Sequence, residues 1–119
     1  MSNAGALGAQ AEMLMHGCEF GDAQLEASMR ERLRTRLAEA ADERRPLRVY
    51  TGYDPTAPDL HLGHSITLRA MRRFQQLGHH VIVVVGTVTA MVGDTSDRAA
   101  GRPRKSAAEV AETARSYAE

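Results

Sequence analysis

An apolar stripe at every fourth position is the first regular pattern along the chain. It follows Asp22, a residue type that caps helix N-termini. We predict a helix from Asp22 to about Arg44 that packs by this stripe and leaves a charged face in solvent. RNA binding by the arginines of that face is the alternative. The stripe consists of Leu25, Met29, Leu33 and Leu37.

The segment before this helix is rich in glycine, alanine and methionine and shows no clear period. We therefore predict a partly packed leader. His16 and Cys18 are residue types that ligate metals, but no second pair completes a site, so we expect no metal here. The candidate anchors of the leader are Leu14, Met15 and Phe20.

Two β-prone runs flank the next helical pattern. The first covers Leu47 to Thr51, and the second, Val81 to Val85, is a continuous β-branched run typical of a strand covered on both faces. Between them the apolar spacing predicts a helix from about Leu62 to Leu77, with Gly78 as its C′ residue. Strand, helix and strand within about 40 residues predict a Rossmann-like α/β unit with a parallel sheet and a right-handed crossover.

The last part of the chain combines a basic stretch with a helix start. Ser106 and Glu109 have the spacing of a capping box and predict a final helix. That helix reaches Glu119 without a stop signal, so we expect the chain to be a fragment. The basic stretch is either a solvated loop or a contact for polyphosphate or tRNA. Its residues are Arg98, Arg102, Arg104 and Lys105.

Composition narrows the class of protein. The 119 residues are the size of one small domain, and 15 basic residues balance 15 acidic ones, so nucleic-acid binding would need a local patch. The single cysteine, Cys18, fits a reducing compartment, and we expect a cytoplasmic location without a signal peptide. No apolar run approaches the roughly 20 residues that span a bilayer, so we expect no membrane contact.

Most of the polar chemistry lies at a strand–loop–helix junction in residues 50–67. A helix N-terminus carries unpaired N–H groups and a partial positive charge, and it therefore attracts phosphates. Two histidines three positions apart can donate hydrogen bonds to phosphate oxygens, and the glycine between them lets a ligand approach the backbone. Such nucleotide sites form at the carboxyl ends of parallel strands. The residues concerned are Asp54, Thr56, His61, Gly63 and His64.

The motif His61-Leu62-Gly63-His64 resembles the His-Ile-Gly-His motif of class I aminoacyl-tRNA synthetases. The longer string GYDPTAPDLHLGH, and VVVGTVTAMVGDTSDR further on, are similar to the tyrosyl-tRNA synthetase family in order and spacing. The resemblance begins at about Leu47 and implies the N-terminal half of a class I nucleotide-binding fold. We accordingly expect a leader and an amphipathic helix in residues 1–45 and a partial Rossmann-like catalytic domain in residues 46–119.

The resemblance also implies a reaction. Tyrosine and ATP would form tyrosyl-adenylate, and tyrosine would then pass to tRNA(Tyr). Thr56, His61 and His64 are the implied catalytic residues, and the ATP would carry a magnesium ion that no protein side chain ligates. The implied ATP-binding residues are Gly52, Asp54, Thr56, His61, Gly63, His64 and Thr67.

Tyrosine recognition is implied for three further residues. Tyr50 would bind the phenolic hydroxyl, and Thr89 and Asp94 would bind the α-ammonium group. Ala90 and Thr95 stand where the family often has glycine and proline. The family's lysine-rich loop and the second half of its fold do not occur in the sequence, so we expect very little activity from the chain alone. We expect homodimers of the full-length parent.

Two alternatives stay open. A tryptophan-specific synthetase or a small adenylyl- or cytidylyltransferase would also carry an H-x-G-H motif, although Tyr50 and Asp94 favour tyrosine. A truncated, synthetase-like module that binds nucleotide or RNA without catalysis is the alternative from another class. Amino-acid-dependent ATP–pyrophosphate exchange distinguishes the enzymes, and the coding sequence after Glu119 tests the binding module.

Overall fold

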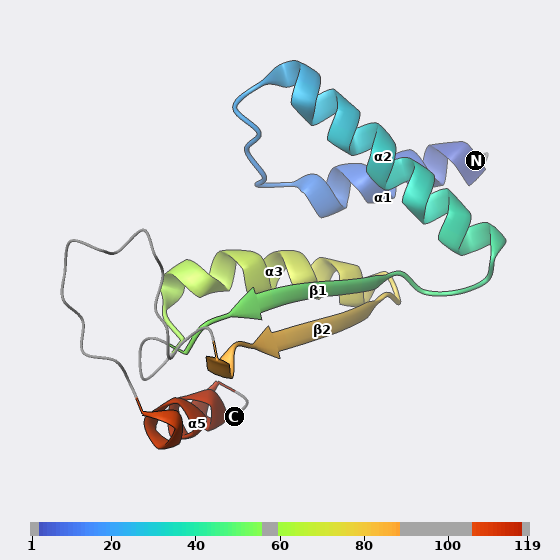
Figure 1. Ribbon diagram of the computed structural model, residues 1–119. Coiled ribbons are helices and arrows are strands. Elements are labelled where there is room, and N and C mark those ends of the chain that lie inside the picture. The colour runs from blue at the N-terminus through green and yellow to red at the C-terminus, as the bar shows by residue number, and fades with distance from the viewer. Residues whose placement is uncertain (1–2, 56–59, 89–105, 118–119) are drawn as a thin grey trace. The chain divides into compact units, whose positions relative to one another are not determined.

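The computed structural model describes residues 3–55, 60–88 and 106–117. Within these ranges four helices and two strands are assigned (Figure 1). They are α1 (Asn3–Met15), α2 (Ala23–Asp42), β1 (Arg48–Tyr53), α3 (Leu62–Gln76), β2 (His80–Val85) and α5 (Ala107–Ser116). The chain divides into two compact units, Met1–Val49 with Leu68–Val81 and Tyr50–Thr67 with Ile82–Glu119.

The two strands form a parallel pair joined by α3, which confirms the predicted strand–helix–strand unit. The His80 N–H donates to the Leu47 carbonyl at 2.8 Å, and the Gly86 N–H donates to the Tyr53 carbonyl at 2.8 Å. Because both pairs have the same offset in sequence, the strands run in the same direction. β1 extends two residues beyond the predicted end at Thr51, since its pairing continues to Tyr53.

The first unit has a small apolar core built from both N-terminal helices, the end of α3 and the start of β1. Leu37, Ala40 and Leu47 are buried there together with two residues of α1. Partly buried side chains surround them, and these are Leu7, Leu33, Val49, Phe74 and Leu77.

The leader predicted before Asp22 forms helix α1 over Asn3–Met15. Ala11 is completely buried and Leu14 is 3% exposed, so α1 belongs to the core. With Leu7 these residues are spaced by four and three positions, which is a helical stripe. Alanine and glycine are frequent in α1, so its buried positions differ little in hydrophobicity from its exposed ones. The helical period is therefore hard to see in the sequence. Leu14 is an anchor as predicted.

Helix α2 follows the sequence prediction at its start and departs from it along its stripe. Asp22 is the N-cap, and its carboxylate accepts a hydrogen bond from the Gln24 N–H at 2.9 Å. Leu37 is buried, but Leu25 and Met29 are 46% and 41% exposed. The predicted packing of the whole stripe is therefore wrong for its first half, because the buried residues of α2 lie only in its second half.

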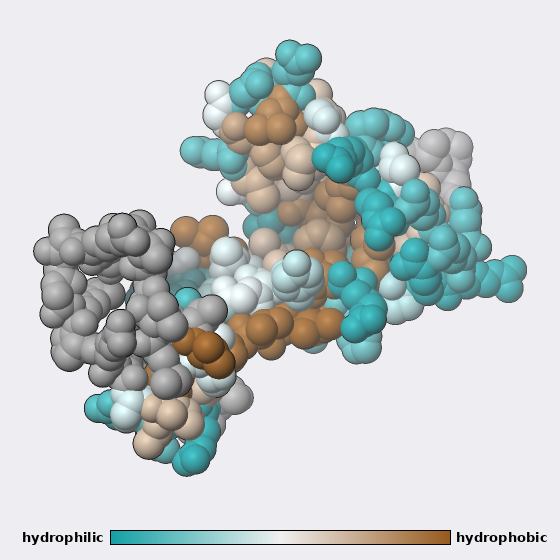
Figure 2. Space-filling model, in the orientation of Figure 1, coloured by the Kyte–Doolittle hydropathy of each residue, from teal (hydrophilic) through white to brown (hydrophobic). Residues whose placement is uncertain are grey.

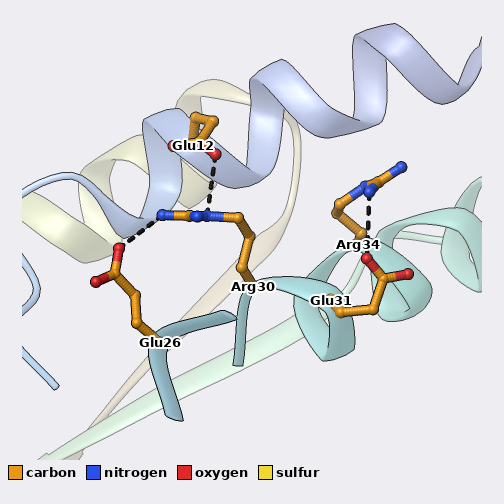
Figure 3. Close-up of polar contacts among 5 residues, drawn as sticks. All are labelled: Glu12, Glu26, Arg30, Glu31 and Arg34. Carbon is orange, nitrogen blue, oxygen red and sulfur yellow. Dashed lines mark hydrogen bonds and ion pairs between the residues drawn. The ribbon is translucent and has the colours of Figure 1, made fainter. Parts of the chain in front are cut away.

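Several side chains on the charged face of α2 form ion pairs (Figure 3). The Arg30 guanidinium contacts Glu26 on its own helix at 2.6 Å and Glu12 on α1 at 2.9 Å. Arg34 contacts Glu31 at 3.2 Å. Arg36 contacts Glu39 at 2.8 Å, so three arginines of α2 have carboxylate partners, as a charged face in solvent would have. Exposed pairs of this kind contribute little stability, about 0–1 kcal/mol each.

Both α2 and α3 end in the same backbone motif. After α3, the Gly78 N–H donates to the Gln75 carbonyl and the His79 N–H to the Phe74 carbonyl, with Gly78 at φ 84°. After α2, Arg44 occupies the corresponding position at φ 51°. This is the Schellman arrangement, in which the C′ residue is left-handed and is usually glycine. Gly78 is thus confirmed as the predicted C′ residue, and α2 ends at Asp42, two residues before the predicted end.

The sheet carries apolar residues that the described part of the chain does not cover. Val83 and Val84 of β2 are 49% and 47% exposed. Figure 2 shows hydrophobic residues, in brown, along this strand. The predicted cover on both faces is therefore not met within the described residues. The helix predicted after Ser106 is confirmed as α5, including its reciprocal capping box with Glu109. None of the helices in the described ranges is long and apolar enough to cross a membrane.

We expect the substitution Arg44→Gly to raise the free energy of unfolding by up to about 1 kcal/mol, because glycine adopts the left-handed conformation without a Cβ penalty. The matched variant Gly78→Ala should lower it by about 1–2 kcal/mol for the same reason. Urea unfolding followed by circular dichroism measures both changes. Equal effects of the two variants would contradict the assigned backbone motif.

We also expect a pH-dependent contribution from His79 to stability. Burial lowers the pKa of this imidazole below its usual 6.5, and its Nδ1 accepts a hydrogen bond from the Leu47 N–H at 3.3 Å. The unfolded state then binds more protons, so stability should fall as the pH drops through about 6.5 and stay flat above it. The difference between wild type and His79→Gln, measured by urea unfolding from about pH 8 to pH 5, isolates this contribution. A difference that does not change with pH would rule it out.

Candidate functional site

The candidate site lies where β1 ends and α3 begins, within the second unit. β1 delivers Tyr53 as its last residue, and Tyr53 is 9% exposed. Its hydroxyl lies 2.5 Å from Thr67 Oγ1, and its ring meets the His64 imidazole edge-on with centroids 5.2 Å apart. A buried aromatic at the strand end therefore supports the second turn of α3.

The direction of the hydrogen bond between Tyr53 and Thr67 follows from the neighbouring carbonyl. The Thr67 hydroxyl donates its single proton to the His64 carbonyl at 2.9 Å. Its oxygen is then the acceptor, so the Tyr53 hydroxyl is the donor. Thr67 was expected to face the ribose of ATP. In this structure the Thr67 hydroxyl hydrogen-bonds to the Tyr53 hydroxyl and to the His64 carbonyl.

His61 and His64 lie side by side, as their spacing predicted. Their ring centroids are 4.0 Å apart with an interplanar angle of 39°. His61 precedes the first helical residue, Leu62, so it is the N-cap residue, and His64 is at position N3. The two imidazoles thus come from the cap and the first turn of a single helix.

The two histidines cap the helix reciprocally. The Gly63 N–H donates to His61 Nδ1 at 3.1 Å, and the His61 N–H donates to His64 Nδ1 at 3.1 Å. The arrangement resembles a capping box, in which two side chains accept hydrogen bonds from backbone N–H groups at the helix start, with imidazoles in place of a serine and a glutamate. Two of the backbone donors that are unpaired at a helix start are satisfied in this way.

The His61 ring lies over the backbone of Gly63. A Cβ at this position would lie 2.9 Å from His61 Cε1 and 3.0 Å from His61 Nδ1, which is closer than side-chain atoms approach. The sequence suggested that the missing side chain leaves space for a ligand. The structure shows that the His61 ring already uses that space. Gly52 differs, because its Cβ would have an ordinary contact of 4.0 Å with the Val84 carbonyl oxygen.

The remaining predicted residues fall into two groups. Tyr50 and Gly52 lie on the face of β1 opposite Tyr53, and Asp54 follows the last residue of the strand. All three are exposed, Tyr50 by 74%. Thr56, Thr89 and Asp94 lie outside the described residues, as does the basic stretch.

Sequence reasoning missed Tyr53 as a member of the site. The signal available was its position at the end of an apolar strand, on the same side as Val49 and Thr51. The contact with Thr67, which is fourteen positions away, depends on how α3 packs and leaves no local trace. No group of three or more metal-ligating side chains occurs in the ranges that the structure describes.

Two parallel strands joined by a helix define an α/β protein of the Rossmann-like class. Comparison with known families identifies which one. Residues 42–119 match the family described as class I tRNA synthetases (W and Y), and the chain belongs to that family.

Curated relatives agree with this assignment. The chain is 53% identical over 83 residues to the tyrosine–tRNA ligase of Aromatoleum aromaticum, a match that covers 70% of this chain and 21% of the relative. The corresponding ligase of Nitrosospira multiformis is 44% identical over 108 residues, covering 91% of this chain and 24% of the relative. The ligase of Chlorobium chlorochromatii is 48% identical over 89 residues, a match that covers 75% of this chain and 22% of the relative. The chain thus spans less than a quarter of the length of these relatives.

Proposed function

We propose that the chain is part of a tyrosine–tRNA ligase and supplies the first half of its nucleotide-binding fold. The observation that carries the proposal is the reciprocally capped helix start, whose H-x-G-H motif opens the helix that joins the two parallel strands. The names of the curated relatives support tyrosine as the amino acid.

In the proposed reaction, a carboxylate oxygen of tyrosine attacks the α-phosphorus of ATP. The bond between the α-phosphorus and the bridging oxygen breaks, and pyrophosphate leaves with its electron pair. The protein supplies position and complementary charge in such a reaction, because no covalent intermediate with a side chain is needed. Magnesium arrives with ATP as part of the substrate.

Each side chain has a proposed role. His61 and Thr56 hold the terminal phosphates as negative charge builds on the leaving group. His64 faces the ribose end, and Thr67, whose hydroxyl proton is donated to the His64 carbonyl, can meet the ribose only as an acceptor. The two imidazoles lie at a helix N-terminus, whose partial positive charge favours the same anion. Gly52 and Asp54 lie near the α-phosphate and the adenylate.

The tyrosine substrate is proposed to bind beside the nucleotide. Tyr50 contacts the phenolic hydroxyl, and its 74% exposure leaves its own hydroxyl accessible. Asp94 and Thr89 bind the α-ammonium group, for which a carboxylate is the natural partner. The tRNA(Tyr) accepts the activated tyrosine in the second step.

The organisation of the parent enzyme is also proposed. Residues 1–45 are a helical leader and residues 46–119 are a partial catalytic domain. The parent acts in the cytoplasm and forms a homodimer. The balanced charge and single exposed cysteine of this chain are compatible with that compartment.

We expect the complete gene product that contains this sequence to catalyse ATP–pyrophosphate exchange with tyrosine, while the 119-residue chain alone shows very little exchange. Tryptophan serves as the matched amino acid, because the family includes both specificities. Exchange with tryptophan but not with tyrosine would overturn the proposed substrate. ATP binding without exchange by the complete product would favour a non-catalytic module.

In the complete enzyme, we expect His61→Ala and Thr56→Ala to slow adenylate formation by about 10²–10³-fold and to change the tyrosine Kd far less, because their contacts strengthen in the transition state. Single-turnover kinetics and equilibrium dialysis give the two quantities. His16→Ala, an exposed histidine of the leader, is the control and should change neither. Equal losses in rate and in tyrosine affinity would contradict the assigned roles.

A further inference from the structure

The reciprocal cap has a consequence for the protonation of both imidazoles. A ring nitrogen that accepts a hydrogen bond from a backbone N–H carries no proton itself. His61 Nδ1 accepts from Gly63, and His64 Nδ1 accepts from His61. Each neutral ring must therefore carry its proton on Nε2.

We propose that Gly63 is a positioning residue that holds His61 in the Nε2–H tautomer, and that the cap as a whole prepares both histidines as Nε2–H donors before any ligand binds. The inference rests on the proposed function for its role in catalysis, since the Nε2–H groups are the ones that would meet the nucleotide. The tautomers themselves follow from the geometry alone.

Gly63 acts through the space that its missing side chain leaves. Its backbone has no left-handed φ, so alanine would fit the local conformation. The obstacle is the His61 ring, whose Nδ1 and Cε1 lie 3.0 and 2.9 Å from the position of an added Cβ. An added methyl group must push the ring away, and the bond from the Gly63 N–H to Nδ1 is then lost.

Tyr53 restrains the ring of His64, as Gly63 restrains that of His61. Its ring approaches the imidazole edge-on at an interplanar angle of 81°, and its hydroxyl is tied to Thr67 one turn further along α3. The aromatic edge limits rotation of the His64 ring. His61 and His64 are therefore held by different neighbours, so they can be perturbed separately.

The test uses the 119-residue chain with ¹⁵N-labelled histidine at about pH 8, above the usual pKa of imidazole. Long-range ¹H–¹⁵N spectra distinguish a protonated Nε2 from a protonated Nδ1. We expect both His61 and His64 to show a single Nε2–H tautomer. A tautomer mixture or a protonated Nδ1 at either residue overturns the proposal.

The variant Gly63→Ala should shift the His61 nitrogen signals toward the average of the two tautomers and change His64 less. Gly8→Ala in α1 is the matched control, since nothing lies within 4 Å of a Cβ added there. Both variants gain helix propensity, so a fold that fails to form is not expected. His61 signals that are the same in Gly63→Ala and in wild type overturn the role of Gly63.

Titration with magnesium ATP separates this inference from the proposed function. Shifts of both Nε2 signals on addition of ATP support both the assigned tautomers and the proposed function. Nε2–H tautomers that are present but do not respond to ATP support the cap and count against nucleotide binding by this part of the chain.

Discussion

The hydrogen bonds at the first turn of α3 are the constraint on which the site depends. Any helix start leaves backbone N–H groups without partners, and here two of them are satisfied by the imidazoles of His61 and His64. The same side chains that the reaction is proposed to use therefore also complete the helix. A cap made of serine or aspartate would satisfy the backbone equally well, but it would present no outward N–H donor to an anion.

The strand end gives this cap a fixed support. Tyr53 terminates β1, pairs through its carbonyl with Gly86 at the end of β2, and donates its hydroxyl to Thr67 in α3. One residue thus connects the sheet to the turn of α3 that follows the motif. Because a displacement of about 1 Å can slow catalysis by about 10²-fold, such a connection between the sheet and α3 helps to keep the two histidines in place.

The parts of the structure that the sequence predicted are those with local causes. Asp22, Gly78 and the pair of Ser106 and Glu109 act within one helical turn, and their roles are confirmed. The bounds of helix α1 were not predicted, because its apolar stripe uses Ala11 where a larger residue would give a clearer period. The bond from Tyr53 to Thr67 was not predicted either, since it depends on packing. Histidine is an uncommon cap, so spacing predicted that the two rings are neighbours but did not predict how they bond.

The spacing of the H-x-G-H motif can now be related to separate physical demands. The first histidine must be the N-cap and the second must be at N3, because only then can each Nδ1 reach a backbone N–H of the same turn. The glycine must be at N2, since the ring of the N-cap histidine folds over it. The residue at N1, Leu62, is 85% exposed and takes part in none of these contacts. Its replacement of the family's isoleucine therefore leaves the cap intact, whereas a side chain at Gly63 or a shift of either histidine by one position would disrupt it.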